Sequence, residues 1–483
     1  MYSETPPLQP IRPAYRLRIL TDEQLEQFKT ATMTILEDIG VHCPSEKALQ
    51  IYADYGARVD FDRHLVRLSA DVVEKAMRDA PRSYTMGARL PAYDLMLDGQ
   101  AMYCATDGCG VETIDFLTRQ RRPSVKEDIA KSARLADYLS AVGFYWPIVS
   151  AQDFANTAPL HEIQASFSNT VKHVQTETVM GEKMALYAVE MARVVADSGE
   201  NMRLRPPLSS LICTIAPLGQ DKEGMEAALV FAEAGLPVGF MSMVNAGLTA
   251  PATVAGTIAL GDAEIVAALT LIQMAYPGAA VYHSLMPGMM HPHTGTHLST
   301  PWEIELPYAV GVELAHQWGV PSLAGIFGTD AETPGWQAAQ ESATALMLCA
   351  LCGAETGSGM GLLEACTLLY PEAIILDADI YHRVLIDLAG LEVSPPELAL
   401  DVVRQVGPRG NFLSHRHTRQ NLRRRLFSDI TDIPVAGGGF RDPLEVAREK
   451  VDWILANHHP EPLKDAQQRE LERILQSAER ELG

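Results

Sequence analysis

Eight short apolar stretches recur along the chain, and each is followed by an amphipathic helical pattern. The stretches are rich in β-branched and aromatic residues, which is typical of strands buried on both faces of a parallel sheet. Strand–helix units repeated eight times predict an α/β fold, a (β/α)8 TIM barrel, with a doubly wound open sheet as the alternative. The predicted strands are 101–106, 143–150, 170–176, 208–217, 237–244, 279–286, 320–327 and 353–358.

The chain on either side of this repeat is mainly helical. We expect an N-terminal helical extension with a short β-rich stretch over residues 1–100 and the barrel core over 101–370. A C-terminal helical region packed on the barrel is expected over 371–483. Thr21 and Gln24 have the spacing of a capping box, so a helix is predicted to begin directly after Thr21.

The charge balance narrows the class of ligand and partner. Sixty-one acidic residues against 39 Lys and Arg give a formal charge of -22, which argues against nucleic acid or an anionic membrane and favours a cationic ligand or a basic partner surface. Prolines interrupt the start of the chain where a signal peptide needs an apolar core. The seven cysteines have no disulfide-framework spacing, so we expect reduced thiols and a cytoplasmic protein.

The carboxyl ends of the predicted strands are the expected place for chemistry, because barrel enzymes build their sites there. Aromatic residues near strand ends more often pack in the core than contact a ligand, but several that share one rim favour a ligand. The acidic candidates just past predicted strands are Asp107, Glu177, Asp330 and Glu332, and the aromatic candidates are Trp146, Tyr282 and Trp336.

A histidine-rich loop, MMHPHTGTH, follows the sixth predicted strand. Its imidazoles at His291, His293 and His297 could ligate zinc, but no cysteine or carboxylate completes the ligand set locally. A polar role toward a substrate, or a purely structural role in the loop, is therefore favoured over a metal site.

A glycine-rich stretch, GSGMG, ends the eighth predicted strand. Backbone N–H groups at Gly357 and Ser358 could cradle a phosphate at the barrel mouth. A tight turn is the alternative, because isolated glycine motifs are weak signals.

Five ordered stretches spread over nearly the whole chain carry a family resemblance. They are TILEDIGVHCPSEKAL, DFLTRQRRPSVKEDIAKSARLADYL, APATVAGTIALGDAEIVAALTLIQM, TDAETPGWQAAQESATALMLCALCGAE and GPRGNFLSHRHTRQNLR. Together they resemble the trimethylamine methyltransferase superfamily of corrinoid-dependent (β/α)8 enzymes. The resemblance implies that a methyl group passes from a methylamine to the Co(I) of a separate corrinoid protein, with no tightly bound cofactor on this chain.

One departure from the family bears on the substrate. The archaeal branch of the superfamily carries pyrrolysine near the end of the seventh strand, whereas FGTDAETPGWQ in this chain has only standard residues. The chain therefore resembles the non-pyrrolysine branch, whose members demethylate quaternary amines such as glycine betaine. A quaternary ammonium needs no activation, because it leaves as a neutral tertiary amine.

The resemblance gives each candidate an expected role. Aromatic faces bind a quaternary ammonium through cation–π contacts worth about 0.5–2 kcal/mol each. The acids expected at the reacting centre are Asp330, Glu332 and Glu177. The expected substrate-binding residues are Asp107, Trp146, Tyr282 and Trp336, with His291 and His293 for a substrate carboxylate. The residues expected to face the corrinoid are Gly357, Ser358, His415 and His417, with loop and helix-cap scaffolding as the alternative for the two histidines.

Two other functions remain open at this point. The same cage would serve a barrel that binds a quaternary amine without turnover, as a sensor or storage protein. A metal-dependent barrel enzyme that uses the His291 to His297 loop is the other alternative. A homo-oligomer is compatible with either function and with the methyltransferase.

Overall fold

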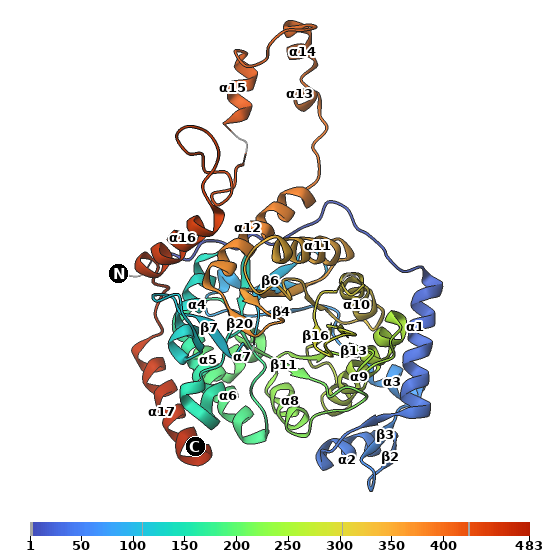
Figure 1. The fold of residues 1–483 in the computed structure, drawn as a ribbon. Helices are drawn as coiled ribbons and strands as arrows, with labels where there is room; N and C mark the ends of the chain where they lie inside the picture. The colour runs from blue at the N-terminus through green and yellow to red at the C-terminus, as the bar shows by residue number, and fades with distance from the viewer. Residues whose placement is uncertain (1–2, 109, 302, 424–425) are drawn as a thin grey trace.

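Eight parallel strands form a barrel at the centre of the molecule (Figure 1). The computed structural model describes residues 3–108, 110–301, 303–423 and 426–483. The barrel strands are β6 (Tyr103–Thr106), β9 (Val142–Tyr145), β10 (His173–Thr176), β11 (Leu208–Cys213), β12 (Val238–Ser242), β14 (Val281–Leu285), β17 (Leu323–Gly325) and β18 (Thr356–Met360).

The order of the strands confirms the predicted barrel. The sheet runs β14–β12–β11–β10–β9–β6–β18–β17, and a parallel bridge between His283 and Ser322 joins its two outer strands. Each predicted strand contains or overlaps an observed one, so the open-sheet alternative is wrong. The eighth strand begins three residues later than predicted, because Gly353, with a φ of 95°, ends the preceding helix in the left-handed conformation.

Helices surround the barrel strands on the outside (Figure 1). They are α4 (Lys126–Tyr138), α5 (Ala158–Asn169), α6 (Glu182–Val195), α7 (Gly199–Leu204), α8 (Lys222–Ala234), α9 (Val254–Ala275), α10 (Glu305–Gln317), α11 (Trp336–Cys352) and α12 (Pro371–Leu388). One described helix, α9, is long and apolar enough to cross a membrane by length and composition, with a mean hydropathy of 1.6. However, 83% of that window is buried inside the protein, as expected for a core helix.

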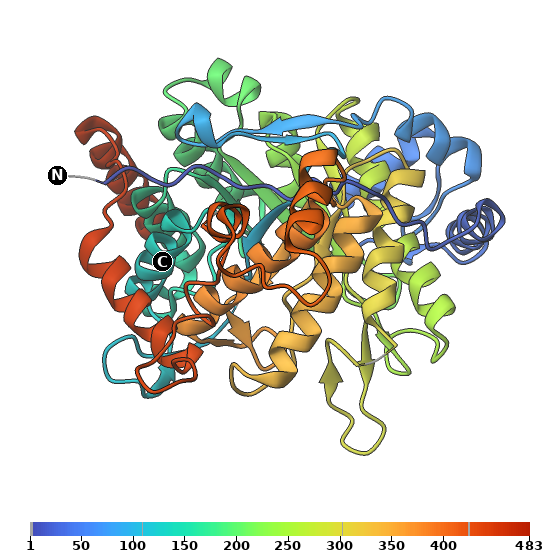
Figure 2. The ribbon, with the colours of Figure 1, turned by 90° about the horizontal axis from the view of Figure 1, so that it is seen from above.

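The N-terminal extension covers one side of the barrel and the end at which the barrel strands begin. The predicted capping box is present at α1 (Asp22–Thr34), where Thr21 and Gln24 each accept a hydrogen bond from the other's backbone N–H. After it come α2 (Glu46–Tyr55), α3 (Ala70–Met77) and a small sheet of β1 (Val41–His42), β2 (Arg58–Asp60) and β3 (Leu65–Arg67). The hairpin of β4 (Tyr84–Met86) and β5 (Leu95–Leu97) packs on the apolar interior of the barrel at the end opposite the mouth (Figure 2).

Two small sheets surround the carboxyl ends of the barrel strands, which we call the mouth. One contains β13 (Asn245–Ala246), β15 (Gly288–Met290) and β16 (His297–Leu298), and the last two form a hairpin that projects from the body (Figure 2). The other contains β7 (Glu112–Ile114), β8 (Arg121–Pro123), β19 (Leu362–Leu363) and β20 (Leu368–Leu369).

The C-terminal region divides into a packed part and a projecting part. α16 (Pro443–Asn457) packs on α12 and α4, and α17 (Asp465–Leu482) packs on α6 and α5. The described residues of 390–427, a segment which we call the arm, leave the body sideways between α12 and α16 (Figure 1). The arm contains α13 (Pro395–Leu398), α14 (Leu400–Val406) and α15 (Arg416–Leu422). The expectation that the whole C-terminal region packs on the barrel is therefore corrected for the arm.

Candidate active site

The last inward-facing side chains of several strands meet at the mouth, because alternate residues of a strand point to the same face. They surround a narrow cavity of about 40 Å³, which we call the inner cavity. Its lining residues are Asp107, Met243, Met286, Pro287, His297, Ser299, Tyr308, Gly325, Gly328, Ser358, Gly359 and Cys366. A wider cavity of about 520 Å³, which we call the outer cavity, shares His297 with it and opens to solvent.

Asp107, directly after β6, supplies a buried carboxyl group to the inner cavity and is only 7% exposed. Its Oδ1 accepts a hydrogen bond from the Gly108 backbone at 2.9 Å, while no nitrogen or oxygen of the described residues donates to its Oδ2. The thiol of Cys366 also forms a hydrogen bond with the carboxyl group of Asp107. Burial raises the pKa of Asp107, and hydrogen bonds from this thiol and from Gly108 offset the rise in part. Asp107 is thus a buried acid with an acceptor atom left for a ligand.

Glu177, directly after β10, forms a second pair of a carboxylate and a thiol. It accepts a hydrogen bond from Cys213 Sγ at 2.8 Å. Burial raises the pKa of Cys213 far above its ordinary value, and the charge of Glu177 raises it further, so this thiol stays protonated and donates. The charge of Glu177 also raises the pKa of Cys366, which lies beside Asp107. Glu177 and Asp107 therefore act electrostatically on the same small space.

Asp330, expected at the reacting centre, holds the loop that follows β16. Its carboxylate accepts hydrogen bonds from the backbone of Ser299 at 2.8 Å and of Thr300 at 3.0 Å. Ser299 lines the inner cavity, so Asp330 positions part of the cavity wall while its own side chain lines the outer cavity.

The outer cavity carries most of the remaining charge at the mouth. Asp330, Glu332 and Glu364 line it together with Arg121. The guanidinium of Arg121 binds both Glu364, at 2.8 Å, and Glu112, so its positive charge is already paired. Glu332 is exposed on the rim of the outer cavity. Asp330 and Glu332, both expected at the reacting centre, therefore line the same cavity.

His297 is the histidine of the predicted loop that reaches the site. It lies between the two cavities, with its Nδ1 atom 2.8 Å from Asn245 Nδ2 and its Nε2 atom 3.2 Å from Ser299 Oγ. Burial lowers the pKa of His297 below its ordinary value, so the imidazole is neutral at physiological pH.

His291 and His293 lie instead at the tip of the β15–β16 hairpin, outside both cavities. Nδ1 of His291 accepts hydrogen bonds from the backbone of His293 and Thr294, each at 3.3 Å, and His293 is exposed. This contact stabilises the turn, so the structure supports the structural role in the loop. It corrects the expectation that these two histidines face a substrate carboxylate.

The predicted aromatic cage is not assembled as expected. Trp146 and Tyr282 are buried in the apolar interior of the barrel, 3% and 1% exposed, and neither lines the inner cavity. The hydroxyl of Tyr282 lies 2.8 Å from Oε1 of Gln175 and 3.0 Å from the carbonyl oxygen of Ser210, so its polar end is occupied.

Trp336, the third expected cage residue, begins α11 and is 85% exposed on the outside of the body. Its position corrects the expectation of a cage role, because it lines neither cavity. Tyr308 of α10 is the one phenyl or indole side chain among the described residues that lines the inner cavity, and its hydroxyl donates to the carbonyl oxygen of Ser299 at 2.6 Å.

The residues expected to face the corrinoid are split between two places. Gly357 and Ser358 belong to β18, and a Cβ at Gly357 would approach Ile326 to 2.4 Å, so this glycine allows close packing in a buried strand. The stretch is therefore not a phosphate-binding loop, although Ser358 lines the inner cavity. His415 and His417 lie on the arm, where Nδ1 of His415 accepts the backbone N–H of His417 at 3.1 Å. The contact caps α15, so the structure supports the alternative in which these two histidines stabilise the arm's own backbone.

Several lining residues had no part in the sequence prediction. Met243 and Met286 could have been found by counting alternate residues past each inward-facing strand position. Tyr308 and Cys366 come from a helix and from the β19–β20 connection, and no local pattern marks them.

In the part of the chain that the structure describes, no group of three or more His, Cys, Asp or Glu could hold a metal ion, so the zinc alternative gains no support.

Replacing Asp330 by Ala is expected to loosen the wall of the inner cavity. Two backbone N–H groups would lose a charged acceptor, a loss of ~1–3 kcal/mol in local stability. Hydrogen exchange of the Ser299 and Thr300 amides should therefore accelerate. Glu332→Gln, on the same rim but exposed, is the matched control. Equal exchange in both variants would remove the positioning role of Asp330.

Known proteins resemble this chain over nearly its full length. A family model described as trimethylamine methyltransferase (MTTB) matches residues 3–483. Trimethylamine methyltransferase MttB of Desulfitobacterium hafniense is 30% identical over 468 residues, which cover 96% of this chain and 94% of the relative. Glycine betaine methyltransferase of the same species is 29% identical over 479 residues, with coverages of 97% and 98%.

A solved structure supports the architecture. The monomethylamine methyltransferase MtmB of Methanosarcina barkeri aligns with a TM-score of 0.52 at 12% identity, over 96% of this chain and 88% of that one. At this identity the likeness concerns the fold alone. From the full-length family match and the relatives of similar length, the chain belongs to the trimethylamine methyltransferase family.

Proposed function

We propose that this methyltransferase takes a methyl group from a quaternary ammonium compound and passes it to the cobalt of a corrinoid carried by a separate protein. The observation that supports a cationic substrate is the composition of the inner cavity. Asp107 lines it and Glu177 lies beside it, whereas no Lys or Arg is among its described lining residues. A permanent cation would neutralise this buried negative charge, which is otherwise unfavourable.

The standard residues that follow β17, at the place where the archaeal branch carries pyrrolysine, favour a quaternary amine over a tertiary one. A tertiary amine is a poor leaving group unless a group in the site activates it, whereas a quaternary amine departs as a neutral molecule. The thiols of Cys213 and Cys366 have raised pKa values and donate to the carboxylates, so they are poor acids toward a leaving amine. The residues that follow β17 are all standard amino acids.

Positioning is the main task left to the protein in such a reaction. Met243 and Met286 line the inner cavity with flexible, polarizable side chains that can adjust to methyl groups. Tyr308 adds an aromatic ring, and the narrow shape excludes bulk water. The carboxylates stabilise the cation in the ground state, so their benefit is expected mainly in substrate binding.

The mouth also leaves room for a partner. The outer cavity shares His297 with the inner cavity and opens to solvent, and three of its eight described lining residues are acidic. When docked there, the corrinoid would supply the cobalt nucleophile that accepts the methyl group. Ser358 and His297 are the residues of this chain that would lie at the inner end of that approach.

A substrate panel tests this function. The purified protein is mixed with free cob(I)alamin and with tetramethylammonium, choline, glycine betaine or trimethylamine, and loss of the Co(I) absorbance is followed. We expect at least one quaternary compound to methylate cobalt, with trimethylamine inactive. Activity with trimethylamine alone would overturn the proposed substrate class. Calorimetric binding of a quaternary amine without any methyl transfer would favour a binding protein instead.

A further inference from the structure

The arm has almost no support within its own chain. None of its three helices, α13, α14 and α15, contains a buried residue. Ten large apolar side chains of the arm are exposed, four of them by more than 70%. They are Leu391, Val393, Leu398, Leu400, Val403, Phe412, Leu413, Leu422, Leu426 and Phe427. An exposed apolar surface of this extent is typical of a protein–protein contact.

The arm also carries a charge opposite to that of the rest of the chain. Residues 390–427 contain seven arginines and three acidic residues, and all seven arginines lie in residues 404–427, where there is no acid. Arg409, Arg416, Arg419 and Arg423 are exposed and form no ion pair within the described part of the chain. A surface that is both apolar and basic therefore projects from an acidic body.

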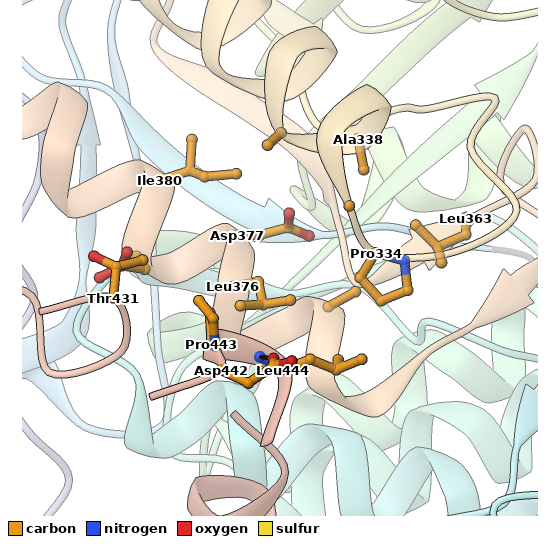
Figure 3. Close-up of a pocket in the computed structure, with 14 residues that line it drawn as sticks. Pro334, Ala338, Leu363, Leu376, Asp377, Ile380, Thr431, Asp442, Pro443 and Leu444 are labelled. Carbon is orange, nitrogen blue, oxygen red and sulfur yellow. Dashed lines mark hydrogen bonds between the residues drawn. The ribbon is translucent and has the colours of Figure 1, made fainter. Parts of the chain in front are cut away.

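The body has a complementary surface at the root of the arm. A cavity of about 340 Å³ lies between α11, α12 and the start of α16, and Figure 3 shows its mainly apolar lining. Asp379 and Asp442 are its carboxylates, while burial raises the pKa of the third acid, Asp377, to about 8, and no basic side chain is among the described residues that line it. The exposed indole of Trp336 follows Pro334 and Gly335 of the same lining. This α11–α12–α16 face thus combines apolar surface with negative charge.

A second cavity, of about 520 Å³, lies on another side of α12. Leu426 and Phe427 of the arm line it together with Ile375 and Leu385 of α12. Asp379 lines both cavities, so the two flank one helix at the point where the arm leaves the body. Ser428 donates to Asp379 at 2.6 Å and thereby fixes the arm's return to the body.

We propose that the arm of one copy of this chain docks on the α11–α12–α16 face of a second copy, in a reciprocal two-fold exchange. Because each receiving face lies at the root of an arm, a two-fold axis beside that root brings each arm onto the other copy's face. The arginines of one copy then lie near Asp379 and Asp442 of the other, and apolar arm side chains enter the cavity of Figure 3. The arm points sideways, so the exchange leaves both mouths open (Figures 1 and 2).

Light scattering and sedimentation equilibrium of the full chain test the exchange. The wild type is expected at twice the chain mass of 52.7 kDa. Replacing Arg416, Arg419 and Arg423 together by Glu should raise the dimer dissociation constant about tenfold or more. Ala339→Trp, an exposed position that lines the cavity, should do the same from the other side of the contact. The matched control reverses three exposed charges away from this face, with Arg78, Lys222 and Arg469 each replaced by Glu, and should leave the constant unchanged.

Mixing the arm variant with the face variant distinguishes exchange from an arm that folds back on its own chain. A mixed dimer retains one wild-type arm on one wild-type face, so mixing should partly restore dimers that neither variant forms alone. Circular dichroism melting of each variant checks that it is folded. A wild type that stays monomeric at every concentration, a dimer that neither variant weakens, or mixing that restores nothing would each overturn the proposal.

Discussion

Asp107→Asn is expected to weaken binding of the quaternary amine by ~30-fold or more while changing kcat much less. Removing one partner of a desolvated charge pair typically loses ~2–5 kcal/mol, and each 1.4 kcal/mol is about tenfold in affinity. Asn preserves the shape of the side chain, so the loss would report the charge. Isothermal calorimetry with tetramethylammonium measures affinity, and the cobalamin assay gives kcat and KM.

The pH dependence adds a second readout for the same residue. Burial raises the pKa of Asp107 above its ordinary value, and a cation binds the ionised carboxylate better than the neutral acid. Affinity should therefore rise as the pH increases through that raised pKa, and Asp107→Asn should remove this rise. Glu332→Gln on the rim of the outer cavity is the matched control, with an expected change below about threefold, because exposed charges are screened. Equal losses in both variants would contradict a specific role for Asp107.

Gly325→Val is expected to reduce methyl transfer by ~100-fold or more with little change in thermal stability. Gly325 lines the inner cavity from β17, and a Cβ there would lie 3.1 Å from Sδ of Met286. The valine methyl groups would fill a space of only about 40 Å³. Misplacement of a substrate by ~1 Å can itself reduce a rate by about 100-fold. Turnover with the active quaternary amine and thermal melting are the two measurements.

Gly328→Ala is the matched control for the cavity-filling variant. Gly328 lines the same cavity, but an added Cβ would meet no atom within 4 Å. It should keep nearly wild-type turnover. If Gly325→Val folds normally and still transfers methyl groups at the wild-type rate, the inner cavity is not the place where substrate binds.

The acidic part of the site was largely predictable from the sequence. Asp107 and Glu177 were expected at the mouth because each directly follows a predicted strand, and parallel strands end at one face of a barrel. Asp330 was expected there for the same reason, but its hydrogen bonds to Ser299 and Thr300 give it a positioning role. Which atoms an acid contacts depends on a loop that is distant in the chain, and no local pattern contains that information.

The positions of the aromatic residues and of the loop histidines could not be predicted from local sequence patterns. Tyr282 lies within the apolar interior, where its register with β12 places it beside Gly239, and the indole of Trp146 packs against Gly108 instead of lining the cavity. Trp336 begins a helix, and the direction of the preceding loop carries it outward. In the β15–β16 hairpin, His297 pairs with Met290 and lies at the site, whereas His291 lies beyond this pair, at the tip of the hairpin.

The (β/α)8 class, the family and the acidic residues at the mouth could all be inferred from the sequence. These depend on periodicity, on residues next to strand ends and on similarity spread over the whole chain. The shape of the inner cavity, the thiol beside each buried carboxylate and the exposure of the arm depend instead on the three-dimensional packing. Those features arise from residues such as Cys366 and Tyr308, which strand register and loop paths bring together from separate parts of the chain.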